Sequence, residues 1–245
     1  MNKLIFFALT LAILMTGCAS NPSVPNNSTG QIQTTYTSAE QLQSGAQAIV
    51  NDFAAGVDRV RGGKPLIAPT VEVKNTPELI SYHEDSNRIT VPWWATQPAE
   101  MRAVFRRFSV GTDIEAEQFF NAFFNGFIIA HEAAHWFQSK ANQSEPTLYS
   151  NENQANRIAV AYWRTKPGGD QFLAHLEELA NRAAASVPNP TPPGEDPVAY
   201  FGANYQLLAE DPLKYGYYQF RFMADAIHNR SQLDFVEMVG APRRH

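Results

Sequence analysis

A nearly continuous apolar stretch, residues 127–138 with the sequence FIIAHEAAHWFQ, constrains this chain more than any other feature. An apolar surface all round is typical of a helix that runs through a protein core. His131, Glu132 and His135 interrupt it, and burying each of these side chains without a partner costs free energy. The two histidines lie one turn apart on one helical face, so both imidazoles can reach a single metal ion. We therefore expect a core helix with a metal site; the alternative is two hydrogen-bonded core histidines beside an incidental acid.

The order of the three residues, H-E-x-x-H, resembles the pattern of zinc hydrolases. Neutral imidazole is a good zinc ligand, and zinc held by three protein groups keeps a fourth position for water, whose pKa falls toward about 7. A carboxylate beside that water can take its proton and later pass it to a leaving amine. We expect one Zn²⁺ per chain, bound by His131 and His135, with Glu132 as general base and then as general acid.

A third protein ligand is expected from the helix that follows the loop over residues 139–150. Glu152 begins this helix, and Asn156 lies one turn later on the same face. Glu152 is the expected ligand, and the amide of Asn156 can accept a hydrogen bond from a liganding histidine and fix its tautomer. Two other acids compete for the role of ligand. Glu145 lies in the loop and is expected in solvent, whereas Asp211 precedes a Tyr-Gly pair, as in aspartate-liganded zincins, with a spacing that differs by one residue.

Residues 127–160 together resemble the gluzincin metallopeptidases, in which H-E-x-x-H is followed in the next helix by E-x-x-A and then Asp or Asn. The longer metzincin motif does not fit, because Gln138 and Ala141 stand where it requires glycine and histidine. Many gluzincins have aspartate at the position of Asn156; the amide keeps the hydrogen-bond acceptor and loses the charge. The resemblance implies a zincin-like fold and hydrolysis of peptide bonds.

The resemblance also implies a tyrosine, histidine or arginine opposite the zinc, where it stabilises the oxyanion of the tetrahedral intermediate. The segment over residues 211–229 is dense in such side chains. Helical spacing puts Tyr218 and Arg221 on one face, and these two residues are the expected oxyanion donors.

The beginning of the chain has the pattern of a targeting segment. A short positive start and an apolar run over residues 4–15, too short to span a bilayer, are followed by small residues. With Gly17 before Cys18, the segment resembles the signal peptide of a bacterial lipoprotein, which is cut before a lipid-modified cysteine. We expect residues 1–17 to be removed and the lipid on Cys18 to hold the protein at a membrane. Ala19 favours the outer membrane, with the protein facing the periplasm.

The mature chain is expected to have two parts. Residues 18–37 are rich in Asn, Ser, Thr, Gln and Pro, which predicts a flexible, lipidated tether. Residues 38–245 are expected to form one zincin-like metallopeptidase domain. Its first helix begins after Ser38 and ends at Gly62, where the helical spacing of apolar residues stops.

Short β-type runs follow this helix at residues 70–73, 79–82 and 88–91, separated by turn-forming clusters. Helical patterns return after residue 96 and continue to the end of the chain. The expected fold class is therefore α+β, mainly helical, with a small antiparallel sheet beside the H-E-x-x-H helix. The resemblance implies that an edge strand of this sheet pairs with the backbone of an extended substrate.

The formal net charge of −5 over 245 residues offers no basic stripe for nucleic acid. We expect a zinc-dependent hydrolase that cleaves peptide bonds in a peptide or protein substrate. One alternative is a zinc-stabilised envelope lipoprotein that binds or assembles other proteins with little or no peptidase activity, although a structural site has no use for Glu132. Another is an amidase that acts on peptidoglycan, although such enzymes commonly use different motifs.

Overall fold

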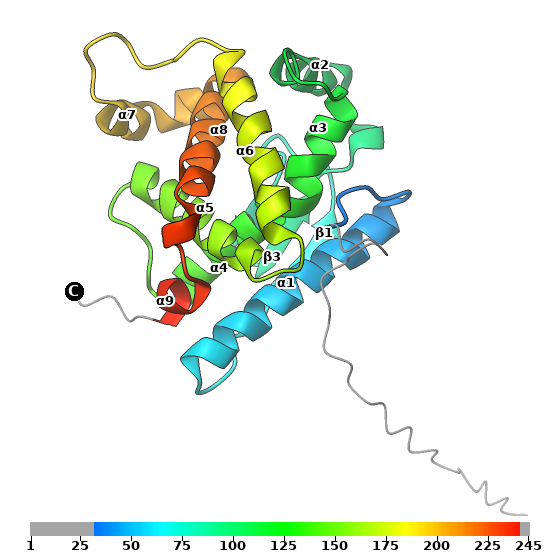
Figure 1. Ribbon diagram of the computed structural model, residues 1–245, viewed down its shortest axis with the longest axis vertical. Coiled ribbons are helices and arrows are strands. Elements are labelled where there is room, and N and C mark those ends of the chain that lie inside the picture. Colours follow the sequence, from blue (N-terminus) through cyan, green and yellow to red (C-terminus); the bar gives the residue numbers. More distant parts are fainter. Residues whose placement is uncertain (1–31, 241–245) are drawn as a thin grey trace, which may run out of the picture.

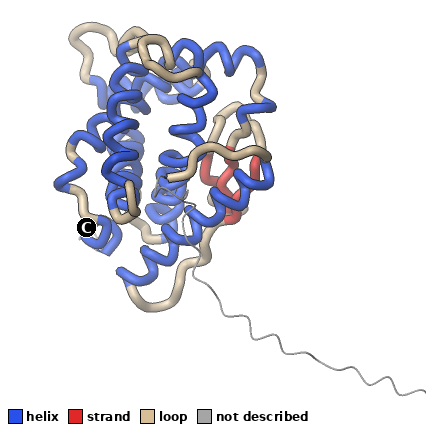
Figure 2. The backbone as a smooth tube through the Cα atoms, turned by 45° about the vertical axis from the view of Figure 1, so that its right-hand side comes forward, coloured by secondary structure: helices blue, strands red, loops and turns tan. Residues whose placement is uncertain are grey.

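Helices make up most of this computed structural model, which describes residues 32–240, together with one small sheet (Figure 1). The expected signal peptide and the lipidation site at Cys18 lie outside the described residues. The strands gather at one side of the helical body (Figure 2). The helices are α1 (Ala39–Arg61), α2 (Ala99–Phe108), α3 (Ala116–Ala122), α4 (Ile128–Lys140), α5 (Leu148–Arg164), α6 (Gly169–Ala185), α7 (Pro197–Ala209), α8 (Pro212–His228) and α9 (Phe235–Gly240), and the strands are β1 (Thr70–Val73), β2 (Ser81–His83) and β3 (Arg88–Val91). The mainly helical α+β class is confirmed.

The sheet is mixed, so the expectation of an antiparallel sheet was wrong for β1. The strand order is β1-β3-β2, with β1 parallel and β2 antiparallel to β3. Apolar alternation marks a strand and its buried face without specifying the direction of its neighbour, so the sequence pattern could not reveal this arrangement. The second strand also begins later than expected, because Leu79 has φ 64° and belongs to the preceding turn.

Helix α1 confirms the expected boundaries. The Ser38 hydroxyl accepts a hydrogen bond from the backbone N–H of Gln41, and Gly62 ends the helix with φ 64°. The side-chain oxygens of Gln47 and Gln43 accept from the backbone N–H groups of Val71 and Val73 on β1, at 2.8 and 3.5 Å. Helix α1 therefore covers the outer edge of β1, which would otherwise present unpaired N–H groups.

Residues just before Ser38, at the end of the expected tether, contact the folded domain. Tyr36 is only 7% exposed, and its ring packs so closely against α1 that a Cβ at Gly45 would lie 2.4 Å from the tyrosine hydroxyl. The Thr34 carbonyl accepts a hydrogen bond from the side chain of Asn125 at 3.0 Å. Polar composition suggested a flexible segment here, but a single buried aromatic side chain and one long-range hydrogen bond hold the end of the segment in place.

Helix α4 lies at the centre of the structure. It packs against α1 and α5 and also contacts β2 and β3. A five-residue π-helical segment, Phe123–Phe127, joins α3 to α4 without a break, and all five of its residues are buried. Such segments occur mostly as single turns and frequently next to functional sites. The predicted core helix over residues 127–138 is therefore confirmed.

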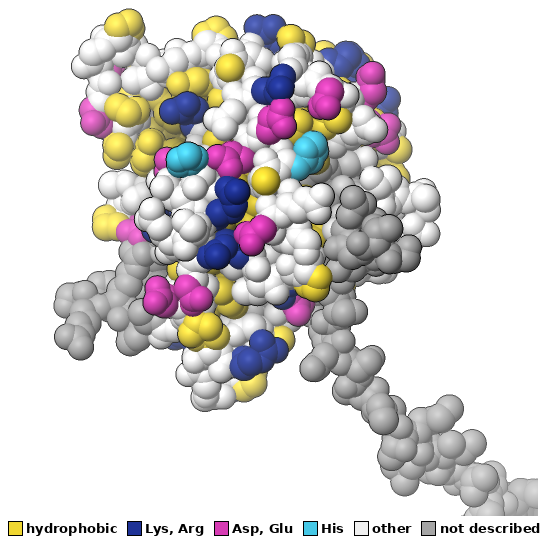
Figure 3. Space-filling view, in the orientation of Figure 1, with side chains coloured by type: hydrophobic (Ala, Val, Ile, Leu, Met, Phe, Trp, Pro, Cys, Tyr) yellow, Lys and Arg dark blue, Asp and Glu magenta, His cyan; other side chains and the backbone are white. Residues whose placement is uncertain are grey.

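Helix α7 differs from the other helices in its surface. It carries no charged side chain, and Leu207 and Val198 on it are 65% and 39% exposed. Hydrophobic side chains show at the upper left of Figure 3, where Figure 1 places α7. The inner face of α7 packs on α8 and α5 through an aromatic cluster that includes Phe201 and Phe222.

Candidate metal centre

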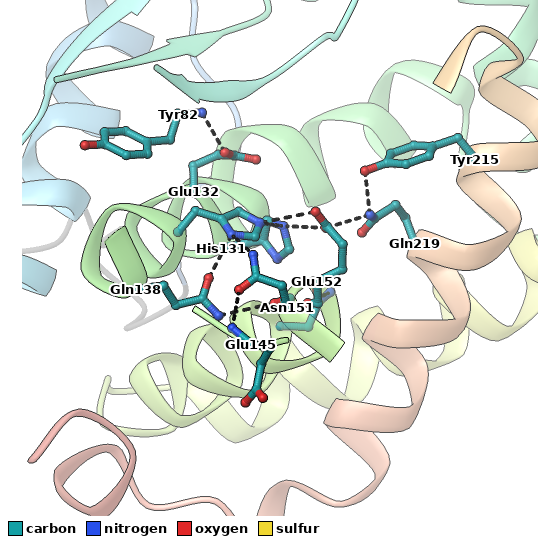
Figure 4. Close-up of polar contacts among 11 residues, drawn as sticks. Tyr82, His131, Glu132, Gln138, Glu145, Asn151, Glu152, Tyr215 and Gln219 are labelled. Carbon is teal, nitrogen blue, oxygen red and sulfur yellow. Dashed lines mark hydrogen bonds and ion pairs between the residues drawn. The ribbon is translucent and has the colours of Figure 1, made fainter. Parts of the chain in front are cut away.

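Three side chains from two helices converge on one point, as the sequence predicted. His131 and His135 come from α4 and Glu152 from α5 (Figure 4). The Nε2 atoms of the histidines are 3.1 Å apart, and they lie 3.4 Å (His131) and 3.5 Å (His135) from the carboxylate oxygens of Glu152. Among the described residues, this buried group is the one set of histidine and acidic side chains arranged so that it could hold a metal ion.

The packing of α4 against α5 explains why these side chains meet. The two helices are joined by a short loop and pack against each other, and both carry fully buried alanines, including Ala134 and Ala155. Small side chains allow the two backbones to approach closely. Helix α5 begins at Leu148, earlier than expected, because Thr147 caps it by accepting from the backbone N–H of Ser150. Glu152 therefore lies inside the helix and has a fixed backbone.

The charges of the group support cation binding. Burial alone would lower the pKa of His135, but the nearby Glu152 carboxylate outweighs burial and raises the pKa to about 9. Burial opposes ionisation of Glu152, yet the two histidines hold its pKa well below the usual range. Glu152 is thus an anion that requires a positive partner in a buried site, either a proton on an imidazole or a metal ion.

Two glutamines contact the group, and sequence reasoning missed both. The Gln138 side-chain oxygen lies 2.9 Å from His135 Nδ1, and the Gln219 side-chain nitrogen donates to Glu152 Oε2 at 2.8 Å (Figure 4). Gln138 lies three residues after His135 on the same helix, so helical spacing alone could have identified it. No sequence pattern connects Gln219, on α8, to the site.

The role expected for Asn156 is not the one in the structure. Its side-chain nitrogen donates to the backbone carbonyl of Glu152, one turn earlier, at 3.0 Å. Asn residues often bond to their own helix in this way, which competes with longer-range partners. The Nδ1 atom of His135 instead faces Gln138, and within residues 32–240 the buried Nδ1 atom of His131 has no hydrogen-bond partner.

Glu132 lies beside the metal-binding group and also contacts the sheet. Its Oε2 atom accepts a hydrogen bond from the backbone N–H of Tyr82 at 2.7 Å. Tyr82 belongs to the edge strand β2 and is paired with Ile89 of β3, and its N–H points away from β3 toward α4. The outer edge of β2 thus runs along the site, whereas the outer edge of β1 is covered by α1.

Tyr218 and Arg221 do not face the metal-binding group, which corrects the expectation for them. The Tyr218 hydroxyl bonds to that of Thr191, and its ring packs on Phe201 in the aromatic cluster under α7. Arg221 is exposed. At about 100° per residue, Arg221 is turned about 200° from Gln219, which points at Glu152.

Tyr215 lies on the face of α8 that turns toward the metal-binding group, where Tyr218 was expected. Its hydroxyl accepts a hydrogen bond from Gln219 at 2.9 Å, one turn away on α8. Burial raises its pKa well above the usual range, with further contributions from the negative charge of Glu152 and from Tyr205. Burial likewise raises the pKa of Tyr205, on α7, and the charges of Glu152 and Glu132 add to this shift. Both phenols therefore keep their protons and can donate hydrogen bonds near the site.

A scan against protein-family models, a search of curated proteins and a search of solved structures each found no match. The geometry of the site therefore carries the functional argument. In the described part of the chain, none of the helices is both long and apolar enough to cross a bilayer.

Proposed function

We propose that this chain is a zinc-dependent hydrolase, specifically a metallopeptidase with a gluzincin-like site in a zincin-like fold. The observation that carries the proposal is the close spacing of the donor atoms of His131, His135 and Glu152. Tetrahedral ligands at zinc distances of about 2.0–2.2 Å are about 3.3–3.5 Å from one another. The two histidine Nε2 atoms are 3.1 Å apart, His131 Nε2 lies 3.4 Å from Glu152 Oε2, and His135 Nε2 lies 3.5 Å from Glu152 Oε1. Two nitrogens with one carboxylate form a donor set that zinc accepts.

The chain supplies the rest of the chemistry around the metal. When bound, zinc polarises a carbonyl group and lowers the pKa of water toward about 7. Glu132 takes the proton of the attacking water and passes it to the leaving amine. The hydrogen bond from the Tyr82 N–H holds one carboxylate oxygen of Glu132, so the side chain keeps its orientation during both transfers. His131, His135 and Glu152 bind the metal.

Tyr215 is the proposed donor to the oxyanion, in place of Tyr218 and Arg221. It lies on the same face of α8 as Gln219, which bonds to Glu152, and its raised pKa keeps the phenol protonated at neutral pH. A protonated hydroxyl held beside the reacting carbonyl stabilises the negative charge that develops on the oxygen. Its oxygen accepts from Gln219, and the phenol also hydrogen-bonds to Tyr205, so an oxyanion would take the Tyr215 proton in place of Tyr205.

The proposed substrate is an extended segment of a peptide or protein. The outer edge of β2 runs beside Glu132, so a peptide laid along this edge would pass the catalytic carboxylate. The lipid on Cys18 would anchor the enzyme in the cell envelope, at the outer membrane on its periplasmic side. Substrates would then be met in that compartment.

One observation favours a second candidate, a zinc-stabilised lipoprotein that binds or assembles other proteins. The bond between Glu132 and the Tyr82 N–H gives the carboxylate a structural task, which is to join α4 to the sheet. A structural carboxylate of this kind needs no catalytic role. The two candidate functions therefore differ in the role of Glu132, which is catalytic in a metallopeptidase and structural in a binding protein.

Two substitutions of Glu132 separate the candidates. In Glu132→Gln the amide oxygen can still accept from the Tyr82 N–H, but the side chain can no longer take a proton. A metallopeptidase should lose hydrolysis of unfolded protein in both Glu132→Gln and Glu132→Ala while keeping about one zinc per chain. A binding protein should show no zinc-dependent hydrolysis, and only Glu132→Ala should lower its thermal stability.

Zinc content tests the ligand assignment. Wild type should hold about one zinc per chain, and Glu152→Ala should lose it far more readily to a chelator. Equal retention of zinc by the two proteins would reject Glu152 as a ligand. Digestion of peptidoglycan fragments in parallel tests the amidase alternative, because release of peptides from glycan would assign the site to that reaction.

A further inference from the structure

The two glutamines at the metal-binding group present opposite ends of their amides to it. Gln138 lies on α4 and is 1% exposed, and Gln219 lies on α8 and is partly buried. Gln138 turns its oxygen toward a histidine, whereas Gln219 turns its nitrogen toward the carboxylate. An amide accepts at its oxygen and donates at its nitrogen, so its orientation determines what it does.

The orientation of Gln138 is fixed by a second hydrogen bond. Its nitrogen donates to the backbone carbonyl of Asn151 at 3.2 Å, so its oxygen faces His135 Nδ1. An oxygen cannot donate, and Nδ1 must therefore carry the imidazole proton. In a neutral ring the lone pair then lies on Nε2, the atom directed at His131 and Glu152.

Asn151 connects this arrangement to the loop before α5. Its side-chain oxygen accepts from the backbone N–H of Glu145 at 3.0 Å. The backbone N–H of Asn151 also donates to the Thr147 carbonyl at 2.9 Å, so the residue whose carbonyl orients Gln138 is itself held in place. The α4–α5 connection thus acts on His135 through Gln138.

Gln219 acts on the carboxylate from the opposite side. Its nitrogen donates to Glu152 Oε2 at 2.8 Å and to the Tyr215 hydroxyl at 2.9 Å. A neutral donor leaves Glu152 anionic and restricts its rotation, whereas a cation in the same place would neutralise it. The carboxylate thus keeps its charge for the metal ion.

We propose that Gln138 and Gln219 are positioning residues of the metal site, with the acceptor end of one amide fixing the tautomer of His135 and the donor end of the other fixing Glu152. The inference rests on the metal-binding part of the proposed function and is independent of peptide hydrolysis. Loss of such a partner typically weakens metal binding about 10–100-fold.

The test compares metal affinity in three variants of similar shape. Gln138→Met and Gln219→Met remove the amides but keep the length of the side chains. Gln97→Met is the matched control, because Gln97 is also buried, at 5% exposure, and its amide donates to Asn75 instead of the metal-binding group. Dissociation constants for Zn²⁺ are measured by chelator competition on the purified chain, and the absorption bands of bound Co²⁺ report the geometry of the ligands.

We expect about 10–100-fold weaker binding and altered Co²⁺ bands in the first two variants, with wild-type affinity in Gln97→Met. Gln138→Glu, which keeps an acceptor for His135 Nδ1, should retain affinity near wild type even if the loss of the bond to Asn151 lowers its thermal stability. If Gln138→Met does not fold, Gln138→Glu is the variant that reports on the role of Gln138. Wild-type affinity in folded Gln138→Met or Gln219→Met overturns the role of that residue, and equal weakening by Gln97→Met overturns the inference as a whole. Absence of metal binding in the wild type would instead reject the proposed function.

Discussion

Proton release on metal binding gives a quantitative test of the electrostatics of the site. In the metal-free protein the pKa of His135 is raised to about 9, so the imidazole is protonated at neutral pH. A metal ion requires the neutral form and must displace that proton. The 3.1 Å contact between the two Nε2 atoms has room for one shared proton, so one proton should leave for each metal bound.

The size of the pH effect on metal affinity follows from the difference between the pH of the experiment and the pKa of His135. At pH 7 the imidazole is about two units below its pKa of about 9, and each unit is a tenfold factor. Metal affinity should therefore be about a hundredfold weaker at pH 7 than above pH 9, with a slope of about one decade per pH unit. Isothermal titration calorimetry in two non-coordinating buffers of different ionisation enthalpy, at pH 6, 7 and 8, counts the protons.

Release of close to zero protons at pH 7 would refute this reasoning, because it would mean that burial outweighs the Glu152 charge and keeps His135 neutral. An NMR titration of the metal-free protein supplies the control. Glu152→Gln removes the carboxylate that raises the pKa of His135, so the pKa should fall toward or below its ordinary value of about 6.5. Glu72→Gln, at an ion pair with Arg88 on the sheet, should leave it unchanged.

Three other substitutions test separate parts of the structure. Tyr215→Phe should lower kcat for hydrolysis about 10²-fold, whereas Tyr218→Phe should keep kcat near wild type in the same assay. Equal losses in the two variants would contradict Tyr215 as the donor to the oxyanion. Thr147→Ala removes the cap of α5 and should lower the free energy of unfolding by about 1 kcal/mol, as measured by urea denaturation. An unchanged urea midpoint would show that the cap does not stabilise the protein. Gly45→Ala would set a methyl group 2.4 Å from the hydroxyl of Tyr36 and should lower the free energy of unfolding by about 1–3 kcal/mol. Gly202→Ala is the control, because a methyl group there would have nothing within 4 Å and should not destabilise the protein. Equal melting temperatures of the two variants would contradict the packing of Tyr36 against α1.

The metal-binding group could be predicted from sequence because its ligands obey helical spacing. His131 and His135 are separated by one turn of a single helix, and Glu152 follows in the next helix along the chain. Neither inference needs knowledge of how distant segments pack. The apolar surroundings of the motif also indicated its burial, since a helix that is apolar all round belongs in a core.

The parts that the sequence did not predict depend on contacts between distant segments. Gln219 reaches Glu152 across 67 residues, and no periodicity in α8 says which of its faces turns toward α5. The direction of β1 relative to β3 is likewise a property of the chain path between them. Asn156 was misassigned for a local reason, since its amide bonds to its own helix.

Helices α4 and α5 and the loop that joins them form a hairpin that can fold before α8 docks on it. His135 and Glu152 are 17 residues apart (152 − 135), so closing the loop between them costs little chain entropy. Gln219 is 67 residues from Glu152, so its contact forms only when α8 docks. Contacts that are local in sequence are formed at low entropic cost and tend to precede distant ones. The hairpin alone holds the complete ligand set, so a nascent chain can capture metal before the glutamine and the tyrosine of α8 arrive to complete the site.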